Sequence, residues 1–316
     1  MLLRAPQERD AEAVAELLAR RDTADFGRPD YTLDDLLDDW RASQLDMARD
    51  AIVAESPQGS LAGYAIVRRL GTFAAVDPDM EEQGVGSALL DWCEARQREL
   101  CWREHRTAIA AGNVRAEALL SRRGYRVVRS NYRMVLALEG PLPASTTAAT
   151  TAGIAAGVTF RALDAVSDGP ALHAVDQDAF AAVASSEPEP LASFTEEHLQ
   201  AHDLDQQLSR VAQRAGEIAG FALVRRWEGE SAAFVDILAV DPKAQGAGIG
   251  RALLLEVFAA ARRAGLAEAQ LGVAADNPRA LGLYERIGMR PRSQLDIYER
   301  AITGAQHGQA PSQGSP

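Results

Sequence analysis

The chain has 316 residues, of which 47% are hydrophobic and 25% charged, and a formal net charge of −12 at pH 7. This length exceeds what one hydrophobic core usually serves, so we expect two domains in an ordinary globular protein. The acidic charge disfavours nucleic acid and anionic membranes as main partners. Because no segment has the character of a membrane span or a signal-peptide core, the sequence predicts a cytoplasmic protein.

Four sequence blocks occur twice in the same order, which indicates a duplicated domain. The matching pairs are residues 63–69 and 220–226, 76–78 and 240–242, 84–90 and 248–254, and 112–116 and 276–280. We place the two copies at residues 1–140 and 157–303. Residues 141–156, rich in small residues, are expected to form a linker, and residues 304–316 a disordered tail.

Each copy is expected to begin with the same series of elements. A short strand precedes an amphipathic helix, an acidic helical stretch follows, and two strands then lead to a third that ends at Pro78 or Pro242. The expected ranges are 2–4 and 158–161 for the first strand, 11–20 for the first helix, and 32–40 and 195–203 for the acidic stretch.

The second half of the later copy is predicted from periodicity and capping residues. Residues 251–263 carry an apolar stripe typical of a helix, and residues 267–273 alternate as a strand does. Asn277 is expected to cap a further helix that ends near Gly288. A last β segment at residues 295–298 is expected to complete this copy.

A glycine-rich turn joins the strand ending at Pro242 to the helix that follows. Glycines at 246, 248 and 250 let the backbone curl and approach a ligand without Cβ clashes. The amides of such a turn point with the positive end of the helix, and Arg251 adds a full charge at the rim, so the turn suits a phosphate. Its spacing is neither the dinucleotide fingerprint nor a P-loop.

The segment Gln245-Gly246-Ala247-Gly248-Ile249-Gly250 resembles the pyrophosphate-binding motif of the GNAT (GCN5-related) N-acetyltransferases, Gln/Arg-x-x-Gly-x-Gly/Ala. The order of elements in both copies is similar to the same family. The resemblance implies an α/β fold (an α+β mixed sheet) of two tandem GNAT (acyl-CoA N-acyltransferase) domains, each a mixed, mostly antiparallel sheet flanked by helices. It also implies acetyl-CoA (coenzyme A) as the cofactor and direct transfer of the acetyl group to the amine of a small molecule.

The two copies differ where this chemistry would occur. The first has Glu81 and Glu82 in place of Gln245 and Gly246, and two carboxylates would repel a pyrophosphate. It also has Leu120 where the second copy has Tyr284. We therefore predict that the first copy is degenerate and that the second is catalytic.

The resemblance implies a role for each site residue of the second copy. Tyr284 would protonate the leaving thiolate, and Asp236 is a candidate base for the acceptor amine. The plainer alternatives are that Tyr284 is a core tyrosine and that Asp236 hydrogen-bonds a neighbouring strand. The expected cofactor-binding residues are Leu238, Ala239, Val240, Gln245, Gly246, Ala247, Gly248, Ile249, Gly250, Arg251, Asn277, Ala280 and Tyr284.

The acceptor is expected to bind among carboxylates and aromatic side chains, although the same residues also suit a solvated surface. The candidates are Phe180, Glu187, Glu189 and Phe194, with Asp296 and Tyr298 opposite. His198 and His202 stand four residues apart on the acidic stretch, but no third ligand suggests itself. We interpret them as a solvated helix face and predict no metal.

The favoured function is acetyl-CoA-dependent N-acetylation of a small amine. Two alternatives stay open at this point. One is mycothiol synthase, a tandem GNAT enzyme that acetylates a cysteine amine and whose organisation this chain resembles. The other is a non-catalytic protein that binds or senses acyl-CoA. The sequence leaves the oligomeric state open, and the two copies are a candidate intramolecular pseudo-dimer.

Overall fold

The computed structural model describes residues 1–29, 31–41, 45–68, 71–140, 157–181, 188–227 and 229–302. Residue contacts divide the chain into two compact units, unit 1 (Met1–Ser130 with Ser293–Pro316) and unit 2 (Asn131–Arg292). The expected linker and tail lie outside the described residues. Among the described helices, none has both the length and the apolar character needed to cross a membrane.

Unit 1 places helices on both faces of a mostly antiparallel sheet. Its strands follow the order β1-β2-β3-β4-β5-β12, in which β4 and β5 are parallel. Helices α1 and α2 pack on the side of Tyr64 and Ile66, whereas α4 packs on the side of Ala65 and Val67. The elements are β1 (Leu2–Arg4), η1 (Glu8–Asp10), α1 (Ala11–Phe26), α2 (Leu33–Arg41), α3 (Met47–Asp50), β2 (Ala51–Glu55), β3 (Leu61–Arg68), β4 (Gly71–Val76), η2 (Pro78–Met80), α4 (Val85–Glu99), β5 (Glu104–Ala110), α5 (Val114–Arg122) and β12 (Arg290–Ala301).

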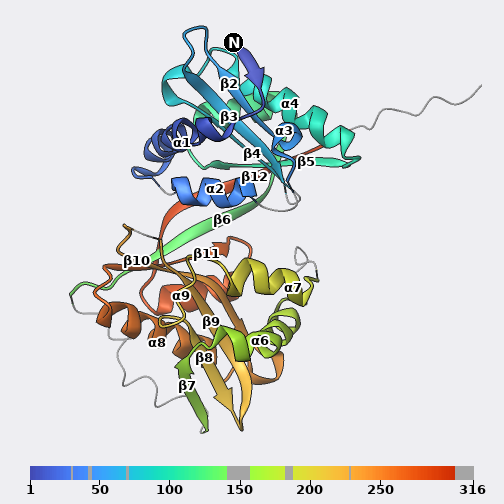
Figure 1. The fold of residues 1–316 in the computed structure, drawn as a ribbon. Helices are drawn as coiled ribbons and strands as arrows, with labels where there is room; N and C mark the ends of the chain where they lie inside the picture. Colours follow the sequence, from blue (N-terminus) through green and yellow to red (C-terminus); the bar gives the residue numbers. More distant parts are fainter. Residues whose placement is uncertain are drawn as a thin grey trace, which may run out of the picture. The chain divides into compact units, whose positions relative to one another are not determined.

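Unit 2 repeats this architecture, with strand order β7-β8-β9-β10-β11-β6. Helices α6 and α7 lie on one side of its sheet and α8 and α9 on the other (Figure 1). Alternation along β9 explains this, because Phe221 and Leu223 face α6 while Ala222 and Val224 face α8. The elements are β6 (Arg126–Ala137), β7 (Val158–Ala162), α6 (Ala165–Phe180), α7 (Leu191–Phe194), the π-helical turn η5 (Thr195–Leu199), β8 (Arg210–Arg214), β9 (Glu217–Arg225), β10 (Ala232–Val240), η6 (Pro242–Ala244), α8 (Ile249–Arg263), β11 (Glu268–Ala274) and α9 (Pro278–Arg286).

The β segment expected to complete the second copy belongs to unit 1 instead. Strand β12 pairs antiparallel with β5, from Leu295 opposite Ala110 to Ala301 opposite Glu104. The corresponding strand of the first copy, β6, pairs with β11 over residues 131–137. The contact boundaries therefore fall inside β6 and β12, whereas the sequence suggested the linker. Because the copies share one pattern, each last strand suits the sheet edge of either copy, which is the condition for exchanging an element.

Two neighbouring parallel strands of unit 2 separate part of the way along their length. Strands β10 and β11 pair from Ala232 opposite Glu268 to Val235 opposite Leu271. Both then continue, β10 to Val240 and β11 to Ala274. No ladder in the described part of the chain joins them beyond Val235, so β10 presents backbone groups of residues 236–240 to the opening. We call this opening the wedge.

Replacing Asn277 by alanine should lower the free energy of unfolding by about 1 kcal/mol, because it removes a helix cap. The Asn277 side chain accepts a hydrogen bond from the Ala280 backbone N–H at 3.0 Å, and Pro278 is the first helical residue of α9. Denaturant unfolding followed by circular dichroism measures the change. Asn277→Asp keeps the acceptor and should stay close to wild type; an equal loss in both variants would contradict the capping role.

Candidate active site

The glycine turn predicted to bind phosphate lies directly after β10 and η6. Gly246 and Gly248 have φ values of 82° and 80°, the left-handed conformation that glycine adopts without strain. A Cβ at either position would meet no atom within 4 Å, so the space beside both glycines is open. The Gln245 side chain braces it, donating to the Val240 carbonyl at 3.1 Å and accepting from Arg279 at 2.8 Å.

Helix α8 begins at this turn and presents its N-terminus to the same side. The first backbone N–H groups of a helix have no intrahelical acceptor, and the helix dipole makes this end favourable for an anion. Ile249 and Ala252 are buried in the core, which fixes the direction of the helix. The predicted residues 245–251 thus form one continuous cradle, and Leu238, Ala239 and Val240 form the β10 side of the wedge that leads to it.

The residues expected on the following helix lie beside the same core. Tyr284 is 8% exposed and packs with the residues that hold α8 against the sheet. Burial raises the pKa of Tyr284 to about 12, so the hydroxyl stays protonated at neutral pH. Within the described chain, no group hydrogen-bonds that hydroxyl. Asn277 caps α9 through Ala280, as its sequence context predicts.

A β-bulge sets the position of Asp236 on β10. The register between β9 and β10 shifts between Val235 and Ile237, so Asp236 is the inserted residue. Val235 faces the α8 core, whereas Asp236 contacts η5 and Ile237 packs on the α6 side. The bulge therefore lies at Asp236, two residues before the Leu238–Val240 stretch that the sequence analysis expected to bind the cofactor. It also coincides with the point at which β10 and β11 separate.

Two side chains, His198 and Arg225, hold the Asp236 carboxylate. Its Oδ2 accepts from His198 Nδ1 at 3.1 Å and pairs with Arg225 Nε at 2.9 Å. Burial alone would raise the pKa of Asp236, but the hydrogen bond from His198 and the charge of Arg225 outweigh burial and lower it. The opposite holds for the ring. Burial by itself would lower the pKa of His198. The hydrogen bond to Asp236 and the negative charges of Asp236 and Glu189 outweigh burial and raise that pKa.

The interpretation of His198 as part of a solvated helix face was wrong. Its side chain is 21% exposed and packs against buried Phe194, with the rings tilted by 51° and their centroids 5.2 Å apart. His202 is exposed and lies in a separate turn after η5, so the two histidines do not share one helical face. The residue spacing alone does not show this, because the π-helical turn and the loop after it replace the expected α-helix.

The metal prediction concerns the same region. In the described residues, ligand atoms of Glu189, Glu197 and His198 lie within 4.8 Å of one another. Glu197 is exposed, and the His198 ring is already hydrogen-bonded to Asp236. This arrangement is common in proteins without an ion, so we keep the expectation of no metal as a prediction.

The structure separates the residues predicted to bind the acceptor. Glu189 Oε2 lies 3.8 Å from His198 Nε2, and Phe180 packs on the core around buried Phe194. Glu187 lies outside the described residues. Asp296 and Tyr298 are part of unit 1, where Asp296 accepts from Ser130 and Tyr298 packs in the core with Leu90, Leu120 and Tyr125. The expectation that they complete the second copy fails because β12 pairs with β5.

The matching turn of unit 1 carries ion pairs. Arg21 and Arg115 both bind the Glu81 carboxylate, and Arg21 also pairs with Asp25. Glu82 adopts a φ of 61° where unit 2 has Gly246, an unfavourable conformation for a residue with a Cβ. A cavity of about 560 Å³ lies beside this turn, between β4 and β5. Unit 1 thus keeps the opening between its parallel strands, but a carboxylate bound by Arg115 stands where unit 2 has the neutral Gln245 bound by Arg279.

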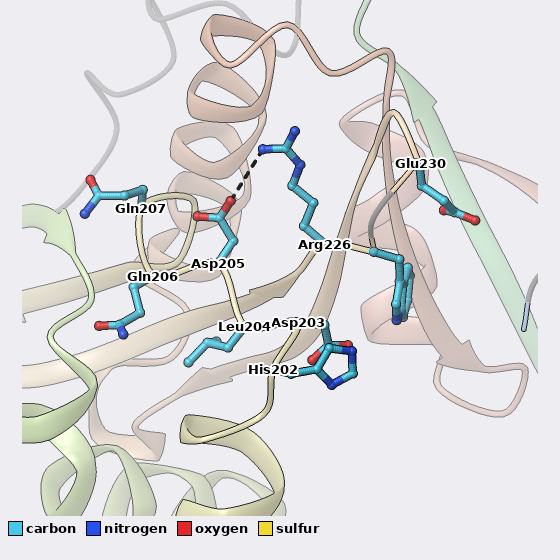
Figure 2. Close-up of a pocket in the computed structure, with 10 residues that line it drawn as sticks. His202, Asp203, Leu204, Asp205, Gln206, Gln207, Arg226 and Glu230 are labelled. Carbon is cyan, nitrogen blue, oxygen red and sulfur yellow. Dashed lines mark ion pairs between the residues drawn. The ribbon is translucent and has the colours of Figure 1, made fainter. Parts of the chain in front are cut away.

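Another hollow in unit 2, of about 580 Å³, lies between residues 202–207 and the β9–β10 hairpin (Figure 2). Its lining is polar, and Arg226 pairs with Asp205 across it at 4.0 Å. None of the site residues predicted from the sequence lines it. Asp203 at its edge pairs with Arg225 at 2.9 Å and so helps to orient the guanidinium that binds Asp236.

Comparison with known proteins agrees with this geometry. The acetyltransferase (GNAT) family matches twice, at residues 11–125 and 171–289. A mycothiol acetyltransferase of Paenarthrobacter aurescens is 33% identical over 243 residues, covering 72% of this chain and 71% of the relative. A second mycothiol acetyltransferase, from Geodermatophilus obscurus, is 32% identical, and the match covers 78% of this chain and 80% of the relative.

Solved structures show the same fold. A GCN5-related N-acetyltransferase from Sphaerobacter thermophilus superposes with a TM-score of 0.77 at 28% identity, covering 96% of both chains. A tandem GNAT protein from the clavulanic acid biosynthesis pathway has a TM-score of 0.72 at 14% identity, covering 96% of this chain and all of the other. With both halves of the chain matched, the protein belongs to the acetyltransferase (GNAT) family and is an N-acetyltransferase built from two tandem domains.

Proposed function

We propose that unit 2 transfers the acetyl group of acetyl-CoA directly to the amine of a small molecule, and that unit 1 is not catalytic. The observation that carries this proposal is the contrast between the two turns. Unit 2 offers open glycines and Gln245, whereas in unit 1 Glu81 is bound by Arg21 and Arg115. Backbone donors at the N-terminus of α8 suit a pyrophosphate, whereas the carboxylates of Glu81 and Glu82 would repel one at the turn of unit 1.

The wedge suits the arm of the same cofactor. From Val240 to Asp236 the strand spans four residues, or about 13 Å, from the phosphate cradle to the point where β10 and β11 join. The unpaired edge of β10 can hydrogen-bond the amides of an extended pantetheine arm, as sheet edges bind extended peptides. We assign Leu238, Ala239 and Val240 to this edge, and Asn277, Ala280 and Tyr284 to the helix that faces the arm.

The reaction needs three further contributions. A backbone N–H near the bulge would stabilise the oxyanion that forms on the thioester carbonyl. Tyr284, protonated at neutral pH, would give its proton to the leaving thiolate. Acidic groups on the other side of β10, with Glu189 foremost, would attract a cationic amine. These roles use residues of unit 2 alone.

For the acceptor we propose the cysteine amine of a cysteinyl-glucosaminyl-inositol, the acetylation that forms mycothiol. The support is the name of the relatives, mycothiol acetyltransferase, together with their coverage of more than 70% of this chain. The deciding assay incubates full-length protein with acetyl-CoA and this acceptor and identifies the acetylated product by mass spectrometry. Glucosaminyl-inositol without the cysteine is the matched control acceptor.

Product from the cysteinyl compound alone would support the proposed acceptor. Turnover of other amines in its place would retain the N-acetyltransferase and overturn the acceptor. If acetyl-CoA binds but no amine in a broad panel is acetylated, the chain is instead a binding or sensing protein, and the proposed function fails.

The contrast between the two turns predicts that unit 1 can be given a cofactor site. The double change Glu81→Gln and Glu82→Gly should raise the number of acetyl-CoA molecules bound per chain from one toward two, because it removes the carboxylate that occupies Arg21 and Arg115. Isothermal titration calorimetry measures the stoichiometry. Glu16→Gln, on the exposed side of α1, is the control. A second site already present in the wild-type protein would contradict this account.

A further inference from the structure

We propose that His198 is the group that takes the proton from the acceptor amine, and that Asp236 and Arg225 are positioning residues for it. This inference rests on the proposed acetyl transfer in unit 2. It moves the base role from Asp236, the candidate that the sequence suggested, to the side chain that Asp236 binds.

The first observation is that the bulge at Asp236 is peculiar to unit 2. In unit 1 the β3–β4 ladder runs without a register shift from Gly63 opposite Val76 to Arg68 opposite Gly71. In the ladder register Thr72 lies opposite Val67 as Val235 lies opposite Val224, so unit 1 has no counterpart of Asp236; Thr72 hydrogen-bonds buried His105 at 2.9 Å. The unit with the open phosphate turn is therefore also the unit in which an inserted residue directs a carboxylate to a histidine.

The second observation is the orientation of the His198 ring. The ionised Asp236 carboxylate lies 3.1 Å from Nδ1, nearer than Arg225 Nη2 at 3.4 Å, so we place the ring proton on Nδ1 and the lone pair of the neutral ring on Nε2. In the described residues Nε2 makes no hydrogen bond, and its nearest charged neighbour is Glu189 Oε2 at 3.8 Å. The free nitrogen thus faces a carboxylate that would attract an ammonium group.

The third observation is that Asp236 itself is a poor base. The oxygen Oδ2 is shared between His198 and Arg225, and the pKa of the carboxyl is below its usual range. Arg225 is fixed in turn by Asp203 at 2.9 Å and by the Glu197 carbonyl at 2.8 Å. This arrangement, a carboxylate that fixes an imidazole by its Nδ1, is how enzymes orient a histidine base.

The place of the pair in the fold agrees with this role. Asp236 lies where β10 and β11 part, at the closed end of the wedge. His198 reaches it from η5, a π-helical turn of a kind that often occurs at functional sites, and Phe194 packs on the ring.

The protons of the reaction balance between these groups and the solvent. The bound ammonium gives one proton to His198 Nε2, and the neutral nitrogen attacks the thioester carbonyl carbon. The N–C bond forms, the C–S bond breaks, and Tyr284 gives its proton to the sulfur. The second proton on nitrogen restores the Tyr284 hydroxyl, and the imidazolium releases its proton to solvent. Each turnover therefore yields one amide, one free thiol and one proton in solution.

The pH dependence follows from the groups around the ring. Asp236 on β10, Glu189 before α7, Asp176 on α6 and Glu197 on η5 are acidic, and Arg225 on β9 opposes them. The combined charge of these groups raises the pKa of His198 above its ordinary value, although burial of the ring acts in the opposite direction. Because the neutral ring is the active form, kcat/KM should rise with pH through that pKa.

The test uses His198→Asn in the full chain, since asparagine can still donate to Asp236 as Nδ1 does but has no second nitrogen that accepts a proton. We expect kcat to fall by about 10²-fold or more and the acidic limb of the pH profile to disappear. The Kd for acetyl-CoA should not change. His202→Asn, four residues along the chain and exposed, should keep the wild-type rate and profile.

Two further variants separate a base from a structural residue. Asp236→Asn should move the acidic limb to lower pH by about one unit, because it removes the charge that favours the imidazolium. Free imidazole should restore part of the activity of His198→Ala and none of that of Tyr284→Phe. The inference is overturned if His198→Asn keeps its rate within threefold with an unchanged pH profile. Failure of the wild-type protein to acetylate any amine would overturn the proposed function instead.

Discussion

Replacing Tyr284 by phenylalanine should lower kcat for acetyl transfer by about 10²-fold or more, the usual contribution of a positioned acid, while the Kd for acetyl-CoA stays unchanged. The ring packs in the α8–α9 core and phenylalanine keeps that packing, so the change removes only the hydroxyl. Within the described chain that hydroxyl has no hydrogen-bond partner, so its loss leaves no buried group unsatisfied. Stopped assays of product, with calorimetric titration of acetyl-CoA, measure the two effects separately.

The pKa of Tyr284 gives the same prediction a second readout. Since burial raises that pKa to about 12, the acid form persists through the alkaline assay range, and wild-type kcat should not fall there through loss of this proton. Tyr132→Phe, which packs on the same core from β6, is the matched control and should retain full activity. Equal kcat for Tyr284→Phe and wild type at every pH would show that Tyr284 is a core tyrosine and no more.

Replacing Gly248 by glutamate should weaken acetyl-CoA binding by at least about 10²-fold, because a like charge at a partly desolvated site costs several kcal/mol. Gly248 is the N-cap of α8, with a φ of 80°, so the side chain also strains the turn that supplies the amides. Calorimetry should find one site per chain in the wild-type protein and none in the variant.

Two other glycine variants serve as controls. The first places the same strained glutamate away from the phosphate turn, and the second places it in the matching turn of unit 1. Gly265→Glu introduces the same side chain at a φ of 77° just beyond the far end of α8, and should bind acetyl-CoA as wild type does. Gly84→Glu makes the matching change in unit 1 and should leave the single site intact. If Gly84→Glu removed a binding site, unit 1 would be a cofactor-binding unit and the division of roles would have to be reversed or shared.

The parts of the site that the sequence predicted are those that depend on local backbone rules. The turn at residues 245–250 needs glycine at two left-handed positions, and Asn277 followed by Pro278 needs only its own helix to form a cap. The duplication is equally visible, because matched blocks in matched order require no knowledge of contacts. For the same reason, aligning the two copies is enough to reveal that the first lacks counterparts of Gln245 and Tyr284.

Tertiary structure decided what depends on residues far apart in the chain. His198 and Asp236 are 38 positions apart, and they meet only because a single inserted residue in β10 redirects a side chain and a π-helical turn presents the ring to it. The exchange of β6 and β12 between the two copies also depends on residues far apart in the chain. Two strands with one residue pattern suit either sheet edge, and long-range pairing decides between them by energies that no local pattern records.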